Sequence, residues 1–246
     1  MSPRGKGKSP LNPGLAAKRA DFVESVLSLN PRLAVFDCDG TLWWGDAGEG
    51  FFYWELKEGL VAAEIARWAR TRYADYKRGK VSEEVMCGEM VTLHCGLREE
   101  EVQRAAIRYF DEHFTASIIA EMGELVRGLE QAECEVWAVS STNQWVIQAA
   151  MRHFEIPENR ILAAAVEVEN GQITDRLIRV PSGHGKAQAI QEVIARTPDA
   201  GFGNSIWDSE MLQMARHAFA VNPNPDLAQI AQENGWSVYH PPRRRR

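Results

Sequence analysis

The 246-residue sequence has few cysteines and no long apolar run. Its four cysteines, at positions 38, 87, 95 and 134, lack the close pairing of zinc sites and redox motifs, so we expect reduced, buried thiols. No apolar stretch approaches the roughly 20 residues that span a bilayer. The segment 1–15 is basic and rich in Pro and Gly, without an apolar signal core. We therefore expect a cytoplasmic protein that does not associate with membranes.

Basic residues are fewer than acidic ones, with 28 Lys and Arg against 34 Asp and Glu. The formal net charge is −6, which argues against a nucleic-acid partner. Basic residues do gather at both ends, in 1–15 and 243–246, and we interpret these segments as solvated, flexible tails. An acidic chain needs locally placed cations to bind an anion, so individual lysines and arginines become informative. The oligomeric state stays open.

Short apolar segments alternate with amphipathic helical patterns over much of the chain. Leu33–Phe36 is a continuous apolar run typical of a strand buried on both faces, and it ends at Asp37. Similar signals recur at Glu135–Val139, Gly201–Gly203 and Ala218–Val221. This alternation predicts an α/β fold, a doubly wound, Rossmann-like parallel sheet, with functional residues at the carboxyl ends of the strands.

A long helical stretch interrupts the alternation after the first strand. From Val61 to Gln131 nearly every segment has helical period, and a weakened capping box begins at Ser82. We therefore expect a helical cap inserted after the first strand. The predicted cap domain covers 46–120, and the predicted core domain covers 16–45 and 121–242.

One local prediction concerns a hairpin. Two alternating segments, Val166–Glu169 and Ile173–Ile178, flank Asn170-Gly171, which is a strong turn signal. Further helices are expected at Pro13–Leu29, Gly185–Arg196 and Met211–Arg216.

The clearest chemical signal is the segment 37–42, Asp-Cys-Asp-Gly-Thr-Leu. Asp37 and Asp39 stand two residues apart directly after a buried strand. Paired carboxylates bind a hard cation through oxygen, or divide the roles of nucleophile and general acid or base. Asp and Gly also favour turns, so a capped turn is the simpler alternative.

This segment resembles the first motif of the haloacid dehalogenase-like phosphatases, and three more segments follow in that family's order. Val136–Ser140 resembles the second motif, an apolar strand that ends in a hydroxyl residue. Lys186, at the start of a helix, resembles the third, and Gly203–Asp208 resembles the fourth. The match covers Leu33 to Val221. It implies a magnesium-dependent phosphatase that hydrolyses a small phosphomonoester through an aspartyl phosphate.

The resemblance also implies individual roles. Asp37 would be the nucleophile, and Asp39 would protonate the departing alkoxide and then deprotonate water. Ser140 would hold a phosphoryl oxygen, and Lys186 would neutralise its charge. The implied Mg²⁺ ligands are Asp37, the backbone carbonyl of Asp39, Asn204 and Asp208. Asn204 departs from the family pattern, because an amide stands where a carboxylate is usual.

Within the family, the chain is most similar to the phosphoserine-phosphatase-like subgroup. That resemblance rests on the hairpin, on the Ser140-Ser141-Thr142 run and on Val221–Leu227. It implies that Asp46 meets a substrate amino group. Trp43 and Ser141 complete the predicted substrate-binding set.

Two substrates fit these residues. The aromatic side chains between positions 43 and 54 either surround a cationic group, as in phosphocholine, or pack the cap against the core. Phosphoserine has a carboxylate that also needs an arginine or lysine. The arginine candidates are Arg67, Arg70 and Arg72.

Two other functions remain open on the same residues. A mutase would pass the phosphoryl group from Asp37 to a second substrate instead of water. A non-catalytic binding protein on a decayed fold would explain Asn204 as lost metal binding. A nucleotide triphosphatase is disfavoured, because Gly183–Ala187 lacks the P-loop glycine spacing and its hydroxyl residue.

Overall fold

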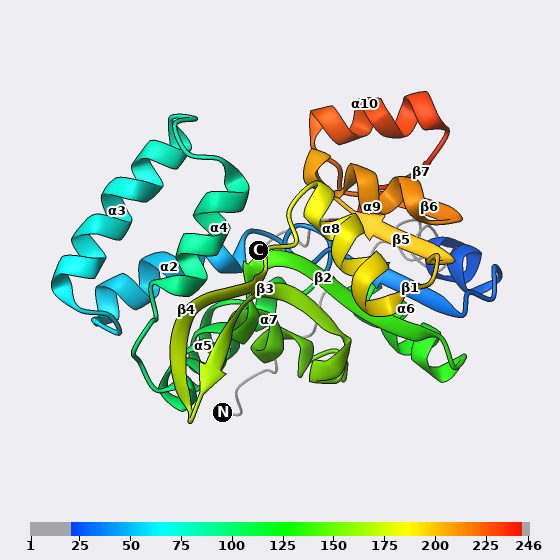
Figure 1. The fold of residues 1–246 in the computed structure, drawn as a ribbon. Coiled ribbons are helices and arrows are strands. Elements are labelled where there is room, and N and C mark those ends of the chain that lie inside the picture. Colours follow the sequence, from blue (N-terminus) through cyan, green and yellow to red (C-terminus); the bar gives the residue numbers. More distant parts are fainter. Residues whose placement is uncertain (1–20, 243–246) are drawn as a thin grey trace, which may run out of the picture.

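A seven-stranded sheet lies at the centre of the computed structural model, which describes residues 21–242 (Figure 1). The strand order is β4-β3-β2-β1-β5-β6-β7, and all neighbours are parallel except β3 and β4. The strands are β1 (Leu33–Phe36), β2 (Glu135–Asn143), β3 (Ile161–Glu169), β4 (Gln172–Arg179), β5 (Ala200–Gly203), β6 (His217–Val221) and β7 (Ser237–Tyr239). The predicted α/β class is therefore confirmed.

Strand β1 is apolar throughout because it pairs with β2 on one side and β5 on the other, and helices cover both faces. Leu33 and Val35 pack into one buried cluster, while Ala34 and Phe36 face the larger cluster on the opposite side. The chain leaves the sheet at Asp37, whose backbone N–H still donates to the Phe202 carbonyl at 2.8 Å. This burial holds Asp37 at the carboxyl edge of the sheet.

Helices fill the predicted insertion between β1 and α6 (Ala120–Gln131). They are α2 (Ala47–Glu58), α3 (Ala63–Lys77), α4 (Glu83–Thr92) and α5 (Glu99–His113). Figure 1 shows α2, α3 and α4 grouped to one side of the sheet. Helix α5 packs on α7 (Gln144–Met151), and α4 packs on β3 and β4, so the insertion is anchored to the hairpin side of the sheet.

Several local predictions are confirmed. Asn170 and Gly171 both adopt positive φ, 52° and 75°, as a tight hairpin turn requires. Ser82 caps α4, because its Oγ accepts from the Val85 N–H at 3.3 Å. Valine at that third position cannot return the bond, which is why the capping box is incomplete.

Other elements differ from the predictions. The helix expected at Gly185–Arg196 is two pieces, α8 (His184–Ala189) and a π-helical turn (Ile190–Ile194). Helix α9 (Ser209–Met214) ends before Arg216, because β6 begins at His217. Helices α7 and α10 (Pro225–Asn234) and strand β7 were not predicted.

Some predictions extend past the described residues. A helix is expected at Pro13–Leu29, and residues 21–27 are helical. Residues 13–20 of this expected helix lie outside the described range. Both basic tails, 1–15 and 243–246, lie outside it as well. Within residues 21–242, no helix is long and apolar enough to cross a membrane.

The four cysteines are free, as expected. Cys38 and Cys134 are buried, whereas Cys95 is exposed, so the prediction of burial is wrong for Cys95. Cys95 follows α4 in a turn at the surface of the insertion.

Candidate active site

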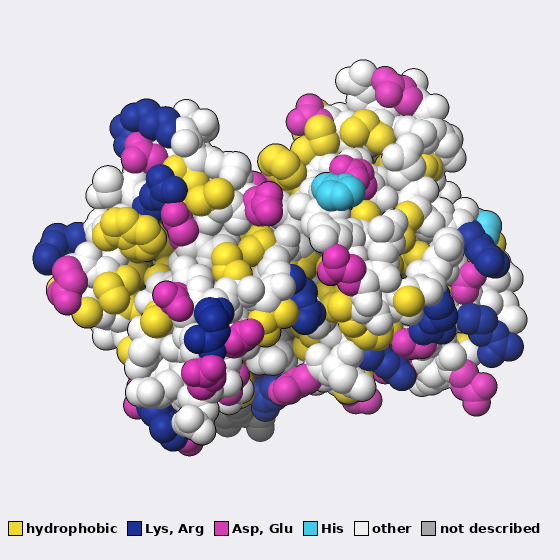
Figure 2. Space-filling model, in the orientation of Figure 1, with side chains coloured by type: hydrophobic (Ala, Val, Ile, Leu, Met, Phe, Trp, Pro, Cys, Tyr) yellow, Lys and Arg dark blue, Asp and Glu magenta, His cyan; other side chains and the backbone are white. Residues whose placement is uncertain are grey.

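A cavity of about 590 Å³ lies where the carboxyl ends of β1, β2 and β5 meet the inserted helices. Figure 2 shows the surface indented between the α2–α4 group and the part that carries α10. Acidic side chains dominate its lining, namely Asp37, Asp39, Asp46, Glu49 and Glu83. Among the described lining residues, Lys186 is the one Lys or Arg.

The Lys186 ammonium joins two carboxylates at the floor of this cavity. Its Nζ donates to Asp37 Oδ1 and to Asp208 Oδ1, each at 2.6 Å, and its side chain is only 3% exposed. Thr41 Oγ1 donates to the other Asp37 oxygen at 2.8 Å. Burial and the charge of Asp208 raise the pKa of Asp37 to about 6, against the lowering effect of Lys186. Asp37 is thus ionised at neutral pH.

Two glycines allow the loops that carry these residues to close on each other. A Cβ on Gly40, whose φ is 78°, would lie 1.8 Å from Asn204 Nδ2. A Cβ on Gly203 would lie 2.5 Å from the Asp208 Cβ. Both positions exclude a side chain, so the loop after β1 approaches the Asn204 amide directly.

Asp208 is held by the loop that precedes it. Its Oδ2 accepts from the backbone N–H groups of Asn204 and Ser205, each at 2.9 Å, and from Ser205 Oγ at 3.2 Å. The carboxylate is fully buried behind Lys186. Its orientation is therefore set before any ligand binds.

Asp39 points away from Lys186 into a different set of donors. Its Oδ1 accepts from the Trp43 indole N–H at 2.7 Å and from the Ala47 N–H at 2.5 Å. Its Oδ2 accepts from Thr142 Oγ1 at 2.8 Å. Burial and the nearby charge of Asp46 nevertheless raise the pKa of Asp39 to about 8. A carboxyl that keeps its proton at neutral pH suits a general acid.

The hydroxyl residues that follow β2's apolar core also reach the cavity. Ser140 is buried, lines the cavity and accepts from the Thr142 N–H at 3.2 Å. Ser141 lines it beside Cys87. The structure thus brings together Asp37, Asp39, Asp46, Ser140, Ser141, Lys186 and Asn204 around one space.

Trp43 lies elsewhere. Its side chain is 0% exposed and packs edge-on against Phe110, in the core beneath the cavity. It contacts the site through its indole bond to Asp39 and through its backbone carbonyl, which accepts from the Gly40 N–H at 2.9 Å. A substrate contact was predicted for Trp43, but its neighbour Trp44 lines the cavity instead.

Asp46, the predicted contact for a substrate amino group, has two roles in the structure. It is the N-cap of α2, with Oδ1 accepting from the Glu49 N–H at 2.7 Å, and it also lines the cavity. The desolvation imposed by surrounding protein raises its pKa.

Sequence reasoning missed several residues of the site. Thr41, buried beneath the cavity, and Thr142, which lines it, stand inside quoted motifs and orient Asp37 and Asp39. Glu49, Tyr73 and Glu83 come from three different helices, and no spacing along the chain signals that they meet. Arg67, Arg70 and Arg72 do not line the cavity, and Arg72 pairs with Glu89 at 2.7 Å.

The oxygen atoms at the cavity floor suit a magnesium ion. Asp37 offers a carboxylate, Asn204 an amide oxygen and Asp39 a backbone carbonyl, and Mg²⁺ prefers oxygen ligands. The fourth predicted ligand, Asp208, is fully buried behind Lys186 and does not line the cavity. Within residues 21–242, no three His, Cys, Asp or Glu side chains gather as a metal cluster, so such a site depends on the neutral oxygens too. The charge of Asp208 raises the pKa of Asp37, and a cation near both would relieve that repulsion.

Comparison with known families decides how this constellation is classified. The model for haloacid dehalogenase-like hydrolases matches residues 34–213, which span all four motifs. The chain belongs to this family. The family resemblance that the segment 37–42 and the three later motifs indicated is therefore confirmed.

Individual proteins give the same picture. The chain is 26% identical over 218 residues to a protein named histidinol-phosphatase from Neisseria meningitidis serogroup C (strain 8013), which covers 84% of this chain and 97% of that one. A crystal structure of a protein of unknown function from Bordetella pertussis Tohama I superposes with a TM-score of 0.76 at 25% identity, over 85% and 97% of the two chains.

A phosphoserine phosphatase, solved as a phospho-aspartyl intermediate analogue, shares the fold. Its TM-score is 0.57 at 17% identity, over 86% of this chain and 94% of that one. Together with the family match, the phosphatase-named relative supports the prediction of a phosphoric monoester hydrolase. The similarity to the phosphoserine phosphatase shows that the two proteins share a fold.

Proposed function

We propose that this hydrolase is a magnesium-dependent phosphatase that cleaves a small, amine-bearing phosphomonoester through an aspartyl phosphate on Asp37. The observation that carries the proposal is the contrast between two carboxylates on one loop. Asp37 accepts from Lys186 Nζ at 2.6 Å, whereas Asp39 meets a separate set of three donors, and burial raises its pKa to about 8. This is the division of labour that a nucleophile and a general acid need.

The residues act in a fixed order. Asp37 attacks phosphorus in line, forming an O–P bond while the ester O–P bond breaks, and Asp39 transfers its proton to the departing oxygen. The Lys186 ammonium and the Ser140 hydroxyl stabilise the phosphoryl oxygens. Asp39 then takes a proton from water, which attacks the acyl phosphate and releases inorganic phosphate and free Asp37. Magnesium, held by Asp37, Asp39, Asn204 and Asp208, would add positive charge at the phosphoryl group.

The charges of the cavity narrow the substrate class. Asp46, Glu49 and Glu83 line the walls above the floor, and no arginine does so among the described residues. A substrate carboxylate would therefore meet acids without a partner, whereas an ammonium group would be attracted. This favours amine-bearing esters that lack a carboxylate over phosphoserine. Histidinol phosphate, named by the Neisseria relative, is such a compound.

We infer that residues 46–120 act as the cap of the site. Glu49 and Tyr73 belong to this insertion and line the cavity. Glu83 in α4 accepts from Ser182 Oγ at 2.8 Å, which joins the insertion to the loop before Lys186. Substrate selection would thus reside in the insertion and phosphoryl chemistry in the sheet edge.

Phosphate release from a defined panel tests the function. The panel contains histidinol phosphate, phosphoserine, phosphocholine, phosphoethanolamine, a sugar phosphate and an aryl phosphate, each with Mg²⁺ or with chelator. We expect Mg²⁺-dependent release, fastest for the amines without a carboxylate. Asp37→Asn should abolish release, while Asp226→Asn, at an exposed site in α10, should retain it.

Two outcomes would contradict this proposal. Release from no compound by folded, Mg²⁺-loaded protein would exclude the phosphatase. Transfer of the phosphoryl group to a second substrate, without free phosphate, would identify the mutase instead.

A further inference from the structure

Lys77 lies beside the candidate active-site cavity and contacts three residues that line it. Its Nζ is 3.3 Å from Glu49 Oε1. It also stands 5.3 Å and 5.9 Å from the ring centroids of Tyr73 and Tyr76. Glu49, Tyr73 and Tyr76 line the cavity, whereas Lys77 does not. A carboxylate beside aromatic rings is a binding site for an organic cation, and here an ammonium already sits in it.

The two sides of this contact differ in rigidity. Tyr73 is 4% exposed and packs against Phe52 and Tyr53, and a hydrogen bond to Glu49 contributes to the raised pKa of its phenol. The Lys77 side chain is 55% exposed in the last turn of α3. Exposed ion pairs are weak, so the lysine is easily displaced while the rings stay in place.

The surroundings of the rings are acidic. Burial first, and then the charges of neighbours that include Glu83, Asp46 and Glu49, raise the pKa of Tyr76 to about 12. A cation near these rings is therefore favoured by the field of the whole wall. The same cavity reaches Lys186 at its floor, so one small molecule can present a phosphoryl group to Lys186 and an ammonium group to the wall.

We propose that Glu49, Tyr73 and Tyr76 form the subsite for the substrate's ammonium group, and that the Lys77 ammonium is an internal competitor for it. This inference rests on the proposed phosphatase function and names the residues that select its substrate. Lys77 limits affinity for amine-bearing esters, because the substrate must displace it before its own ammonium binds.

A matched pair of substrates isolates the ammonium contact. Phosphoethanolamine and 2-hydroxyethyl phosphate differ only in an ammonium group against a hydroxyl. The quantity measured is the ratio of kcat/KM for the amine to kcat/KM for the alcohol. Lys77→Met should raise this ratio about fivefold, through a lower KM for the amine. Glu49→Gln should lower it about tenfold.

Two controls separate the subsite from a general change in charge. Lys80→Met removes a positive charge three residues further along, where Lys80 pairs with Asp75 at 3.5 Å outside the cavity, and should leave the ratio unchanged. In the double variant Glu49→Gln/Lys77→Met, removal of Lys77 should raise the ratio less than it does alone, because the two groups act on each other.

The possible results distinguish a failure of the ammonium subsite from a failure of the proposed phosphatase function. Turnover with equal ratios in all variants, or a lower ratio in Lys77→Met, overturns the subsite and leaves the phosphatase intact. If neither ester is turned over, the phosphatase proposal fails for them, and calorimetric titration of Asp37→Asn with both esters decides the subsite. Tighter binding of phosphoethanolamine, strengthened by Lys77→Met, supports the subsite, and equal binding overturns it.

Discussion

Asp37 and Asp39 show how strongly surroundings divide two identical side chains. They leave the same strand two residues apart, yet one meets an ammonium and the other meets an indole, a backbone amide and a threonine. The pKa of Asp39 rises to about 8 because burial and Asp46 disfavour its charge. In the proposed mechanism, Asp39 therefore supplies the proton that the leaving group needs.

The proton donor role of Asp39 predicts a dependence on the leaving group. In Asp39→Asn, hydrolysis of an alkyl phosphate should fall by about 1,000-fold, because the alkoxide leaves without a proton. Hydrolysis of 4-nitrophenyl phosphate should fall much less in its first step, because nitrophenolate is a good leaving group. Burst kinetics measure that step separately from hydrolysis of the intermediate. An equal fall in the first-step rate for both esters would show that Asp39 is not the proton donor.

Cys87 and Cys95 should differ in reactivity although both belong to the insertion. Burial and the charge of Glu83 raise the pKa of Cys87 to about 12, so at pH 8 only about one molecule in ten thousand carries the reactive thiolate. Because the pKa is raised, labelling of Cys87 should increase only as the pH approaches that value. Cys95 is exposed. Mass spectrometry after iodoacetamide at pH 8 should find Cys95 modified and Cys87 intact, and preferential modification of Cys87 would contradict this.

At the scale of elements, helix α2 depends on a close approach to β2. A Cβ on Gly48, in the first turn of α2, would lie 2.5 Å from Thr142 Oγ1. Thr142 uses that oxygen to bond Asp39, so the helix, the strand and the acid are coupled through one contact. The start of α2 is fixed by Asp46 as N-cap and by the Ala47 N–H on Asp39.

A pair of helical glycines tests this coupling. Gly48→Ala should displace Thr142, lower stability by about 1–3 kcal/mol and reduce kcat. Gly123→Ala, in α6, meets only ordinary contacts at 3.8 Å and 3.9 Å and should raise stability by about 0.5–1 kcal/mol. Urea unfolding and steady-state kinetics measure both effects. If Gly48→Ala is destabilised but its kcat is unchanged, the contact between α2 and Thr142 does not affect catalysis.

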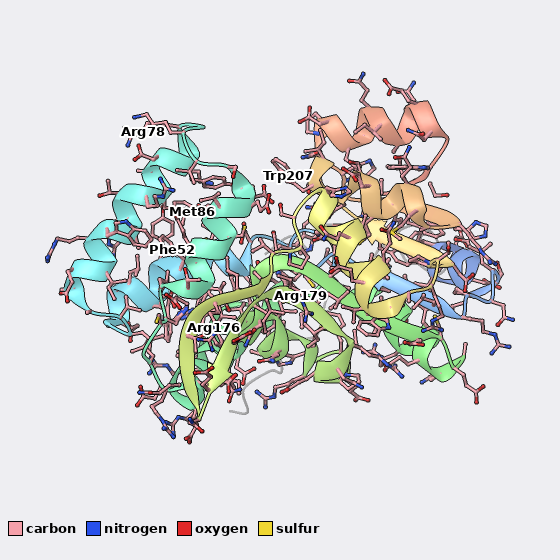
Figure 3. All side chains as sticks on the ribbon, in the orientation of Figure 1. Phe52, Arg78, Met86, Arg176, Arg179 and Trp207 are labelled. Carbon is pink, nitrogen blue, oxygen red and sulfur yellow. The ribbon has the colours of Figure 1, made fainter. Side chains whose placement is uncertain are left out.

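At the scale of the whole molecule, the active site joins the sheet edge to the inserted helices. Figure 3 shows Trp207 and Met86 on opposite sides of this junction, one from the core and one from α4, and both line the cavity. Five acidic side chains line this cavity, of which Asp37 is buried, and Lys186 supplies the positive charge. The described fold therefore holds an excess of acidic groups at this edge of the sheet, which a divalent cation would offset.

Magnesium should accordingly stabilise the folded protein. At about 100 times its dissociation constant, a ligand adds about 2.7 kcal/mol, which for a chain of this size raises Tm by roughly 5–10 °C. Asp208→Asn should lose most of this shift, and Glu210→Gln, an exposed neighbour, should keep it. Differential scanning fluorimetry with Mg²⁺ and with chelator measures the shift. No shift in the wild type would contradict the magnesium site.

Local signals in the sequence predicted the strands β1, β2, β5 and β6, the hairpin and the pair Asp37 and Asp39, and the order of the family motifs added Ser140 and Lys186. Buried parallel strands are continuous apolar runs, Asn170-Gly171 requires positive φ, and the segment from Asp37 to Leu42 adjoins its strand directly. These signals are local, so a single chain reveals them. Helix α10 was missed despite a local signal, since Asn224 is its N-cap and Pro225 its first residue.

Only the tertiary structure decided which side chains face the substrate. Trp43 and Trp44 are adjacent, yet one lies in the core and the other lines the cavity, because backbone direction after a loop does not follow from residue type. Glu49 in α2 meets Lys77 in α3 only because the two helices pack together, whereas the contact of Tyr73 with Lys77 lies within α3 itself. Contacts between elements depend on how helices dock, and periodicity specifies only which face of a helix is buried, not the residues that this face will meet.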